Sequence, residues 1–225
     1  MGEHWLVIDT ASRTGRLGLV RDGVVVGAAA LDAARRHARD LTPTAAALLD
    51  AAGVKPSALA GVIVSIGPGS FTGLRVGIMA AKALSYATGC ALVAVPTFAA
   101  IANRAPAEAT NLWVIADALQ GQAYLQRYRG AEAVGPLEIV TAAEALPAAP
   151  ADVWFGGPGV AVYEKLLAGR SLAAECEPSV ESLFAASRGI APLTRAEMFA
   201  LEPLYLRGSS AEEAARQKPP EGGPP

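Results

Sequence analysis

The chain has few of the side chains from which metal centres and disulfide frameworks are built. Its 225 residues include two histidines, His4 and His37, and two cysteines, Cys90 and Cys176. Neither histidine has a second one at the spacing of a metal-ligand pair, and the cysteines fit neither a metal motif nor a disulfide framework. The sequence therefore predicts no metal site, and its cysteine usage indicates a protein of the reducing cytoplasm.

Catalytic motifs are absent as well. No serine lies in a Gly-x-Ser-x-Gly nucleophile elbow. Both cysteines lie in apolar or weakly acidic surroundings, which do not favour a thiolate. These absences argue against a peptidase or another hydrolase that needs a nucleophile with a base or a pair of metal ligands. The sequence predicts a chain without a complete catalytic set.

Composition and charge exclude two further classes. The formal net charge of −2 gives no overall attraction to nucleic acid, so this chain is not expected to be the principal binder of any RNA. No apolar run approaches the roughly 20 residues of a membrane span. The N-terminus enters a strand-like segment at once, without the pattern of a signal peptide. With 52% hydrophobic residues, the chain can bury the core of a large globular protein.

The first half of the sequence alternates strand-like and helix-like segments. Asp22-Gly23 is a strong hairpin signal, and Asp40 is suited to cap the helix that follows it. We expect strands at 5–9, 16–20, 24–31, 62–66 and 91–95, and helices at 41–52, 74–87 and 97–103. Three antiparallel strands followed by helices and parallel-type strands predict an α/β lobe.

The second half repeats this layout. The segment WLVID at 5–9 is echoed by LWVIAD at 112–117, and each ends in an aspartate followed by a turn and a returning strand. A strand at 153–155 then precedes the glycine-rich turn at 156–159, a helix to about residue 168, and a further helix at 181–187. Repetition at this distance predicts a duplicated, two-lobed α/β fold. We expect lobes at 1–105 and 106–208, and a disordered Pro/Gly-rich tail at 209–225.

The most distinctive stretch is GPGSFTGLRVG at 67–77, a sharp turn between an expected strand and an expected helix. Such turns often hold phosphate, because the amides at a helix N-terminus attract anions. The P-loop lysine is missing, however, and Thr72 occupies the third glycine position of the dinucleotide fingerprint. No acidic residue lies between Asp50 and Glu108 to bind a ribose. Neither phosphate-binding motif is present.

Small residues follow the turn at intervals of four, a spacing that places them on one helix face. They are Gly73, Gly77, Ala81, Ser85 and Gly89. One interpretation is a tight structural turn and a close-packed core helix. The other is a helix–helix contact between subunits, favoured by the polar residues Ser70, Thr72, Arg75 and Lys82 in the same segment.

Asp9 and Asp117 each end a strand beside a hairpin turn. In the actin-like and sugar-kinase-like superfamily, such hairpins approach the phosphates of ATP. The turns here, TASRTG and ALQG, keep the acid but are poor phosphate cradles. A turn or cap residue and a ligand residue therefore both remain open for each aspartate.

A longer match identifies a family. The run GPGSFTGLRVGIMAAKALSYATG at 67–89 closely resembles the signature of the TsaB (YeaZ) family, a bacterial subunit in the synthesis of threonylcarbamoyladenosine in tRNA. WLVIDTAS, RRHARDLTPTAAALLDAAG, the segments 117–124 and 204–207, and the GGPG turn also follow the family's order. The family usually has DARRGEVY where this chain has DALQGQAY at 117–124, which argues against a nucleotide-related role for that hairpin.

The resemblance implies a two-lobed fold of the actin-like ATPase (ASKHA, ribonuclease H-like) superfamily, with degenerate ATP and metal sites. It implies a non-catalytic subunit that dimerises with and activates TsaD, the paralogue that carries a His-x3-His metal site. TsaE, a small ATPase, joins the pair, ATP and magnesium are used by the complex, and tRNA is met through the complex. Homodimers through the same surface are also implied.

The residues implied for the interface lie in the signature, and those of a vestigial nucleotide site lie in the aspartate and glycine turns. The interface residues are Ser70, Phe71, Thr72, Gly73, Arg75, Gly77, Ala80 and Ala81; the vestigial site residues are Asp9, Thr10, Asp117, Gly156 and Gly157. The alternative function is a stand-alone ATP-binding phosphotransferase of the same superfamily, which requires Asp9 and Asp117 near magnesium and phosphate.

Overall fold

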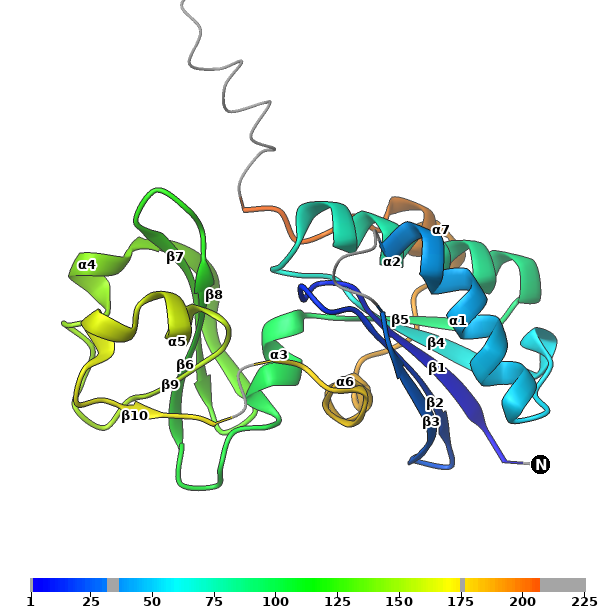
Figure 1. Cartoon of the computed structure of the whole chain (residues 1–225), viewed down its shortest axis with the longest axis horizontal. Helices are drawn as coiled ribbons and strands as arrows, with labels where there is room; N and C mark the ends of the chain where they lie inside the picture. Colours follow the sequence, from blue (N-terminus) through cyan, green and yellow to red (C-terminus); the bar gives the residue numbers. More distant parts are fainter. Residues whose placement is uncertain (1, 32–36, 175–176, 207–225) are drawn as a thin grey trace, which may run out of the picture.

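A computed structural model describes residues 2–31, 37–174 and 177–206. It contains two lobes, each built on its own five-stranded sheet (Figure 1). The expected tail at 209–225 and the arginines before His37 lie outside the described residues. Among the helices of the described segments, none has both the length and the apolar character needed to cross a membrane.

The first sheet has the strand order β3-β2-β1-β4-β5. The first three strands form an antiparallel meander, and β4 and β5 run parallel to β1. Asp22 and Gly23 both have positive φ, 51° and 86°, as a two-residue hairpin turn requires. The strands are β1 (His4–Asp9), β2 (Arg16–Arg21), β3 (Val24–Ala30), β4 (Leu59–Ser65) and β5 (Ala91–Val95).

The second sheet repeats this arrangement with the order β10-β9-β6-β7-β8. Here β6, β7 and β8 form the antiparallel meander, and β9 and β10 continue it in parallel on the other side of β6. The predicted duplicated, two-lobed α/β fold is therefore confirmed. The strands are β6 (Asn111–Asp117), β7 (Gln122–Arg129), β8 (Glu132–Thr141), β9 (Trp154–Gly156) and β10 (Ser171–Leu172).

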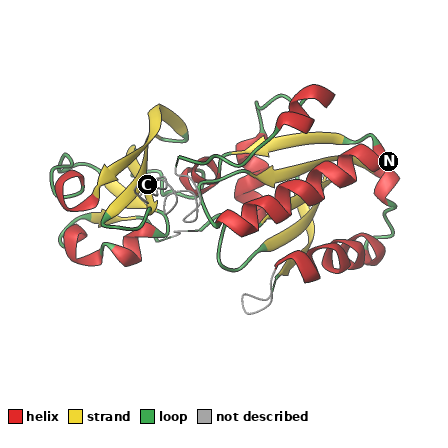
Figure 2. Ribbon diagram, turned by 90° about the horizontal axis from the view of Figure 1, so that it is seen from above, coloured by secondary structure: helices red, strands yellow, loops and turns green. Residues whose placement is uncertain are grey.

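Helices cover both faces of the first sheet, whereas the second lobe carries only short ones (Figure 2). The helices are α1 (His37–Ala51), α2 (Phe71–Thr88), α3 (Thr97–Ala102), α4 (Ala142–Ala145), α5 (Gly159–Val162), α6 (Val180–Ser187) and α7 (Arg195–Ala200). Two 3-10 turns, Pro56–Ala58 and Glu164–Leu167, complete the set for the described segments.

Several boundaries differ from the sequence prediction. Asp40 lies in the first turn of α1 and does not cap it, because that helix already begins at His37. The helix α2 begins three residues before the expected Leu74, because the Ser70 side chain accepts a hydrogen bond from Gly73 N and caps it. Strand β8 was not predicted, since Gly135 and Pro136 interrupt its alternation.

The end of the chain returns to the first lobe, which corrects the expected lobe boundary at 106–208. Val180 and Leu183 of α6 pack in one hydrophobic cluster with Val7 and Ile63 of the first sheet. Met198 of α7 belongs to the cluster on the opposite face of that sheet. Local patterning predicts a helix but not the sheet on which it packs, so this return could not be predicted.

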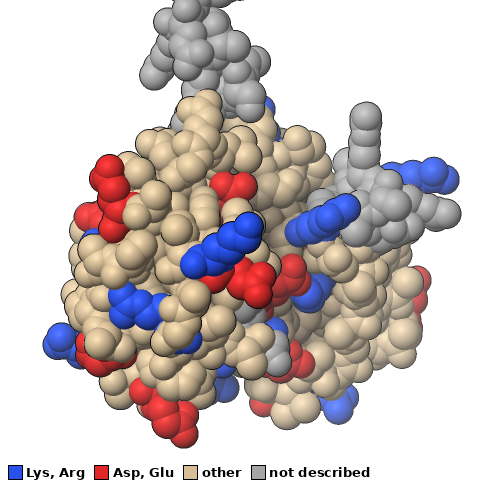
Figure 3. Space-filling view, turned by 60° about the vertical axis from the view of Figure 1, so that its left-hand side comes forward, with Lys and Arg blue, Asp and Glu red and all other residues tan. Residues whose placement is uncertain are grey.

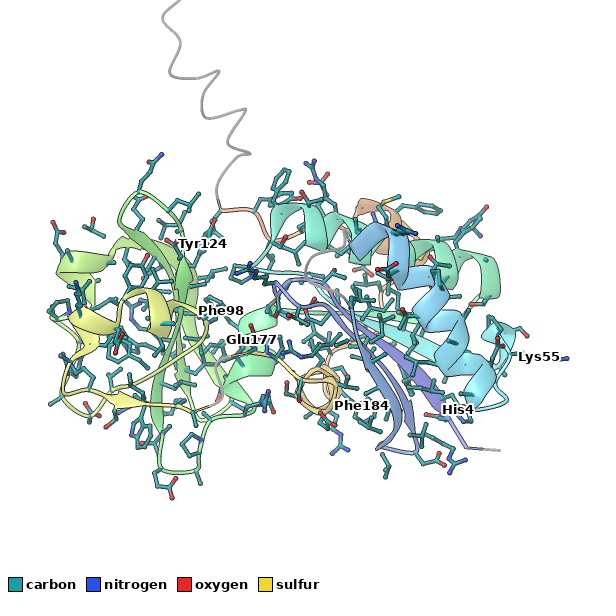
Figure 4. The ribbon with its side chains drawn as sticks, in the orientation of Figure 1. His4, Lys55, Phe98, Tyr124, Glu177 and Phe184 are labelled. Carbon is teal, nitrogen blue, oxygen red and sulfur yellow. The ribbon has the colours of Figure 1, made fainter. Side chains whose placement is uncertain are left out.

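The two lobes meet at α3 and at the segment before α6 (Figure 4). Phe98 of α3 packs in a cluster with Leu112 and Val114 of the second sheet. The Glu177 carboxylate forms an ion pair with Arg16 at 2.5 Å, and its backbone carbonyl accepts a hydrogen bond from Arg104. The junction therefore combines an apolar contact with a polar clamp.

The position of α6 predicts where a core mutation acts. Leu183 is 1% exposed, so we expect Leu183→Ala to lower the free energy of unfolding by about 2–4 kcal/mol in urea denaturation. Leu172→Ala, on a side chain that is 41% exposed, is the matched control and should cost less than about 1 kcal/mol. Hydrogen exchange should accelerate in β1 and β4 of the Leu183 variant; acceleration confined to β6 and β7 would contradict the assignment of α6.

Candidate functional site

The turn before α2 is fixed by bonds to two neighbouring segments. Gly67, with φ of 110°, donates its N–H to Thr97 Oγ1 at 3.0 Å, and its carbonyl accepts from Thr97 N at 2.8 Å. Ser70 N donates to the carbonyl of Ala11 at 2.8 Å. The turn is therefore clamped between the start of α3 and the turn that joins β1 to β2.

The small-residue face of α2 packs on that same β1–β2 turn. A Cβ at position 73 would lie 2.1 Å from the carbonyl oxygen of Thr10, and one at position 77 would lie 2.1 Å from Thr10 Oγ1. Both distances are too short for any real Cβ, so only glycine permits this approach. Ala81, further along the same face, is 0% exposed.

This packing corrects the expectation that the small-residue face contacts another protein. Gly73, Gly77 and Ala81 are buried inside their own lobe, in agreement with the alternative of a close-packed core helix. Ser70 caps the helix, and Ala80 packs partly buried against the core. Of the eight predicted interface residues, Thr72 and Arg75 are exposed along the helix itself.

The opposite face of α2 is exposed, and we call it the outer face. It presents side chains three or four residues apart: Thr72, Arg75, Met79, Ala83 and Tyr86. The two large apolar ones are unusually open for a helix that covers a sheet, with Met79 62% and Tyr86 60% exposed. Sequence reasoning named Thr72 and Arg75 but missed Met79, Ala83 and Tyr86, although the spacing of the row is as regular as that of the buried glycines.

The aromatic side chain of Tyr205, which follows α7 in the sequence, extends the outer face at the start of α2. The rings of Phe71 and Tyr205 lie 4.7 Å apart, and the guanidinium of Arg75 lies 4.1 Å from the Phe71 ring centre. Arg75 Nε also donates to the Tyr205 hydroxyl at 2.9 Å. Phe71 and Arg75 therefore already have partners within the chain, and they form one stacked unit with Tyr205.

A second stacked unit lies at the far end of the outer face. The ring of Tyr86 meets that of Phe199 edge-on at 5.8 Å, and the guanidinium of Arg195 lies 5.2 Å from the Tyr86 ring. Phe199 is 59% exposed. Between the two units, Lys82 Nζ donates to the carbonyls of Phe199 and Leu201 and holds α7 against α2. No sequence signal connects these distant residues.

Asp9, at the end of β1, is buried and bonded within the chain. Its carboxylate accepts hydrogen bonds from Ser65 Oγ at 2.6 Å, Ala11 N at 3.0 Å and Ser12 Oγ at 3.2 Å, and the residue is 1% exposed. Burial raises the pKa of Asp9 above its ordinary value of 3.8, against the opposing effect of the three hydrogen bonds and of Arg16. The side chain ties the β1–β2 turn to the end of β4.

Thr10, the next residue along the β1–β2 turn, is buried as well. It is 0% exposed, and its hydroxyl has no hydrogen-bond partner although it is buried against Gly77. A buried hydroxyl without a partner carries a desolvation cost of about 1–3 kcal/mol. The tight contact between the β1–β2 turn and α2 therefore includes a destabilising contribution from the unpaired hydroxyl of Thr10.

Asp117 occupies the equivalent position in the second lobe but is exposed. Its Oδ1 accepts from Leu119 N at 2.8 Å and from the Tyr163 hydroxyl at 3.1 Å. Burial, together with the bond to Asp117 and its charge, raises the pKa of Tyr163 to about 12. Asp117 thus acts as a turn residue, in a turn whose residues Leu119 and Gln120 both have positive φ.

The glycine turn after β9 leaves no open cradle. A Cβ at Gly157, where φ is 92°, would lie 2.5 Å from the carbonyl oxygen of Ile115. A Cβ at Gly156 would make only ordinary van der Waals contacts, the nearer with Leu112 and the more distant with Ala173. Gly157 therefore serves a close approach of the turn to β6, as Gly73 serves the approach of α2 to Thr10.

These positions do not fit magnesium and a nucleotide phosphate. Asp9 is enclosed by its own donors, Thr10 is packed on Gly77, and the Gly157 amide region lies against β6. Within the described segments there is also no group of three or more histidine, cysteine, aspartate or glutamate side chains that could hold a metal ion. The five residues of the predicted vestigial site thus have structural contacts of their own.

Comparisons with known proteins show which family this chain resembles. The family model for "TsaD: tRNA N6-adenosine threonylcarbamoyltransferase" matches residues 27–220. An uncharacterized protein of Mycobacterium tuberculosis is 35% identical over 93% of this chain and 94% of its own. The tRNA threonylcarbamoyladenosine biosynthesis protein TsaB of Bacillus subtilis is 29% identical over 55% of this chain and 54% of its own length. The solved structure of YeaZ from Pseudomonas aeruginosa superposes with a TM-score of 0.75 at 26% identity, covering 91% of this chain and all of that one.

The contacts of Thr10 predict that substitutions of Gly73 and Gly77 respond differently to truncation of the Thr10 side chain. We expect Gly77→Ala to lower the free energy of unfolding by about 1–3 kcal/mol, and Thr10→Ala to abolish this cost in the double variant, because the clash is with the Thr10 side chain. Gly73→Ala is the matched control: it meets the Thr10 backbone, so Thr10→Ala should not relieve it. Urea denaturation of the two double-mutant cycles measures both terms, and equal rescue at the two positions would show that the packing is wrong.

Burial of Asp9 predicts a pH dependence of stability. Because its pKa is higher in the folded chain than the unfolded value near 3.8, its contribution is full below that value and is lost as pH rises through the folded pKa. Relative to Asp9→Asn, which does not titrate, the wild-type free energy of unfolding should therefore fall between acidic and neutral pH. Urea denaturation across this range measures the difference, with Asp50→Asn at an exposed carboxyl as the control. A difference that rises with pH contradicts the assignment.

Proposed function

The chain belongs to the TsaB (YeaZ) family, and from this membership we propose that it is a non-catalytic subunit of the complex that transfers a threonylcarbamoyl group to N6 of the adenosine beside the tRNA anticodon. Relatives named for tRNA threonylcarbamoyladenosine biosynthesis support the process. The matching family model, described as the threonylcarbamoyltransferase TsaD, supports a paralogous catalytic partner. The chain acts by binding that partner and activating it.

The internal contacts of the aspartates support a non-catalytic role. A phosphotransferase of this fold needs a carboxylate that reaches magnesium, and Asp9 is 1% exposed with three donors around it. Asp117 is exposed, but its Oδ1 is engaged by Leu119 and Tyr163. The stand-alone phosphotransferase therefore has no observation in its favour. ATP and magnesium act elsewhere in the complex.

The outer face of α2 is the observation that carries the proposal. It combines exposed apolar side chains, Met79 and Tyr86, with the arginine–aromatic units around Arg75 and Arg195. Aromatic side chains, methionine and arginine are the types enriched at the centres of protein interfaces. The TsaD-like partner binds here. A homodimer through the same face forms when the partner is absent, and a TsaE-like ATPase joins the assembled pair.

The charge distribution supports an indirect contact with tRNA. On the face shown in Figure 3, basic and acidic side chains are interspersed and do not form one broad basic surface. Strong binding of a phosphate backbone needs several lysine or arginine contacts together. With a net charge of −2, the chain leaves tRNA binding to its partner.

Substitution on the outer face tests the proposal. We expect Met79→Glu to weaken binding to the TsaD-like protein of the same organism by about tenfold or more, because it places a charge in an apolar contact. Val162→Glu, at a side chain 56% exposed on α5 of the second lobe, is the matched control and should bind as the wild type does. Isothermal titration calorimetry with the purified partner measures both. Unchanged affinity for the Met79 variant, or equal loss for the two variants, contradicts the proposed surface.

A further inference from the structure

Positively charged side chains outnumber negatively charged ones on α2 and on the segment that lies beside it. The helix α2 carries Arg75 and Lys82 and no acidic residue, and α7 adds Arg195. The acidic residues of α7 and of the segment 201–206 are Glu197 and Glu202. The Glu197 carboxylate caps the N-terminus of its own helix, so its charge is already engaged there.

Lys82 is paired within the chain. Its Nζ donates to the carbonyls of Phe199 and Leu201 at 3.0 and 2.6 Å, at the C-terminal end of α7. A cation at that end of a helix satisfies carbonyls that have no partner inside the helix. The charge of Lys82 therefore holds α7 beside α2 (Figure 1), and of the three cations the two arginines remain for contact with another molecule.

Neither arginine has a carboxylate partner among the described residues. The ion pairs found there lie at the lobe junction and on the second sheet. Within the same part of the chain, the side chain of Arg75 donates its Nε alone, to the Tyr205 hydroxyl at 2.9 Å, and the side chain of Arg195 donates to no acceptor. Because a guanidinium carries five N–H donors, most of the donors of both side chains are unused.

Stacking restricts both guanidinium groups. The guanidinium carbon of Arg75 lies 4.1 Å from the ring centre of Phe71 and 5.5 Å from that of Tyr205. That of Arg195 lies 5.2 Å from the ring centre of Tyr86. An aromatic ring covers the plane of a guanidinium and leaves its N–H edge open for two parallel hydrogen bonds to a carboxylate. Because the side chains are already restricted, less conformational entropy is lost when such bonds form.

A protein that covers the apolar side chains of the outer face must also cover the arginines. Met79 and Tyr86 are the large exposed apolar residues of this row, Arg75 precedes Met79 by one turn, and Arg195 lies against Tyr86. A guanidinium that is taken out of water without a partner is strongly unfavourable. The surface that binds here therefore needs carboxylates opposite both arginines.

We infer that the TsaD-like partner presents two carboxylate side chains to the outer face, one to Arg75 and one to Arg195, with apolar side chains between them. Arg195 stacks on Tyr86, eleven positions after Arg75, so the two sites are about 16 Å apart along the helix. Eleven positions are close to three helical turns. One partner helix with two acidic residues about eleven positions apart would thus present both on one face. This inference rests on the proposed function, because it specifies the chemistry of that same partner.

Charge substitutions, measured by isothermal titration calorimetry with the purified TsaD-like protein, test the inference. We expect Arg195→Gln and Arg75→Gln each to weaken binding by about threefold to tenfold, because a carboxylate of the partner loses its cation. Arg195→Glu should weaken binding further, because like charges then meet. Raising NaCl from about 0.05 to 0.5 M should weaken binding of the wild type but strengthen binding of Arg195→Glu, since salt screens attraction and repulsion alike.

Arg188→Glu is the matched control. The guanidinium of Arg188 also lies over an aromatic ring, 5.6 Å from that of Phe184. Phe184 belongs to α6, which packs on the other face of the first sheet, so this variant should bind as the wild type does. Circular dichroism checks the fold of each variant, and if substitution of one arginine prevents folding, the other arginine carries the test.

The outcomes separate this inference from the proposed function. If Met79→Glu weakens binding but both glutamine variants bind as well as the wild type or more tightly, the partner surface is apolar and this inference alone is wrong. If the glutamine variants lose affinity for tRNA and keep their affinity for the protein, the arginines bind phosphate, which also overturns it. A wild type that does not bind the TsaD-like protein overturns the proposed function and this inference with it.

Discussion

The contact between the β1–β2 turn and the helix α2 determines most of what this protein can do. Gly73 and Gly77 let Thr10 approach the helix so closely that no larger residue fits at either position. Once those glycines face inward, the helical repeat sends Met79 and Tyr86 outward. The same contact encloses Asp9, because the turn that carries it is pressed between the helix and the end of β4. A single packing constraint therefore removes a carboxylate from solvent and at the same time exposes a row of side chains on the helix.

Comparison of the two lobes shows what the contact between the β1–β2 turn and α2 adds to the sheet topology that the lobes share. In the second lobe a glycine turn again approaches the first strand of its sheet, with Gly157 against Ile115. The helix that follows, α5, has only four residues and offers no long outer surface. Asp117 stays exposed, although it ends the strand equivalent to that of Asp9. The sheet occurs twice, but within the described residues the first lobe alone has a long helix behind its glycine turn, and the surface that we propose for a partner lies on that helix.

Sequence patterns predicted the parts of the fold that depend on local residues. The repeated strand-and-aspartate units gave the two-lobed architecture, and Asp22 with Gly23 gave the hairpin between β2 and β3. They could not give the return of α6 and α7 to the first lobe, which rests on contacts far apart in the chain. The candidate site, too, was predictable only where it depends on local residues and not where it depends on distant contacts. The glycine spacing on α2 was visible, but whether it faced a partner or the chain's own turn depended on Thr10, more than sixty residues earlier.

An aspartate at the end of β1 is not by itself a sign of nucleotide binding in this fold. Whether its carboxylate is free to bind a ligand depends on the direction of its hydrogen bonds. A ligand carboxylate must keep free lone pairs toward solvent, whereas Asp9 directs its oxygens to Ser65, Ser12 and the backbone of Ala11. These hydrogen bonds offset part of the free-energy cost of burying the carboxylate. Desolvation is still the larger effect, because the pKa of Asp9 is raised. The carboxylate therefore holds the turn at an energetic cost, and its value lies in fixing Thr10 against Gly77 and, through that contact, the orientation of the outer face of α2.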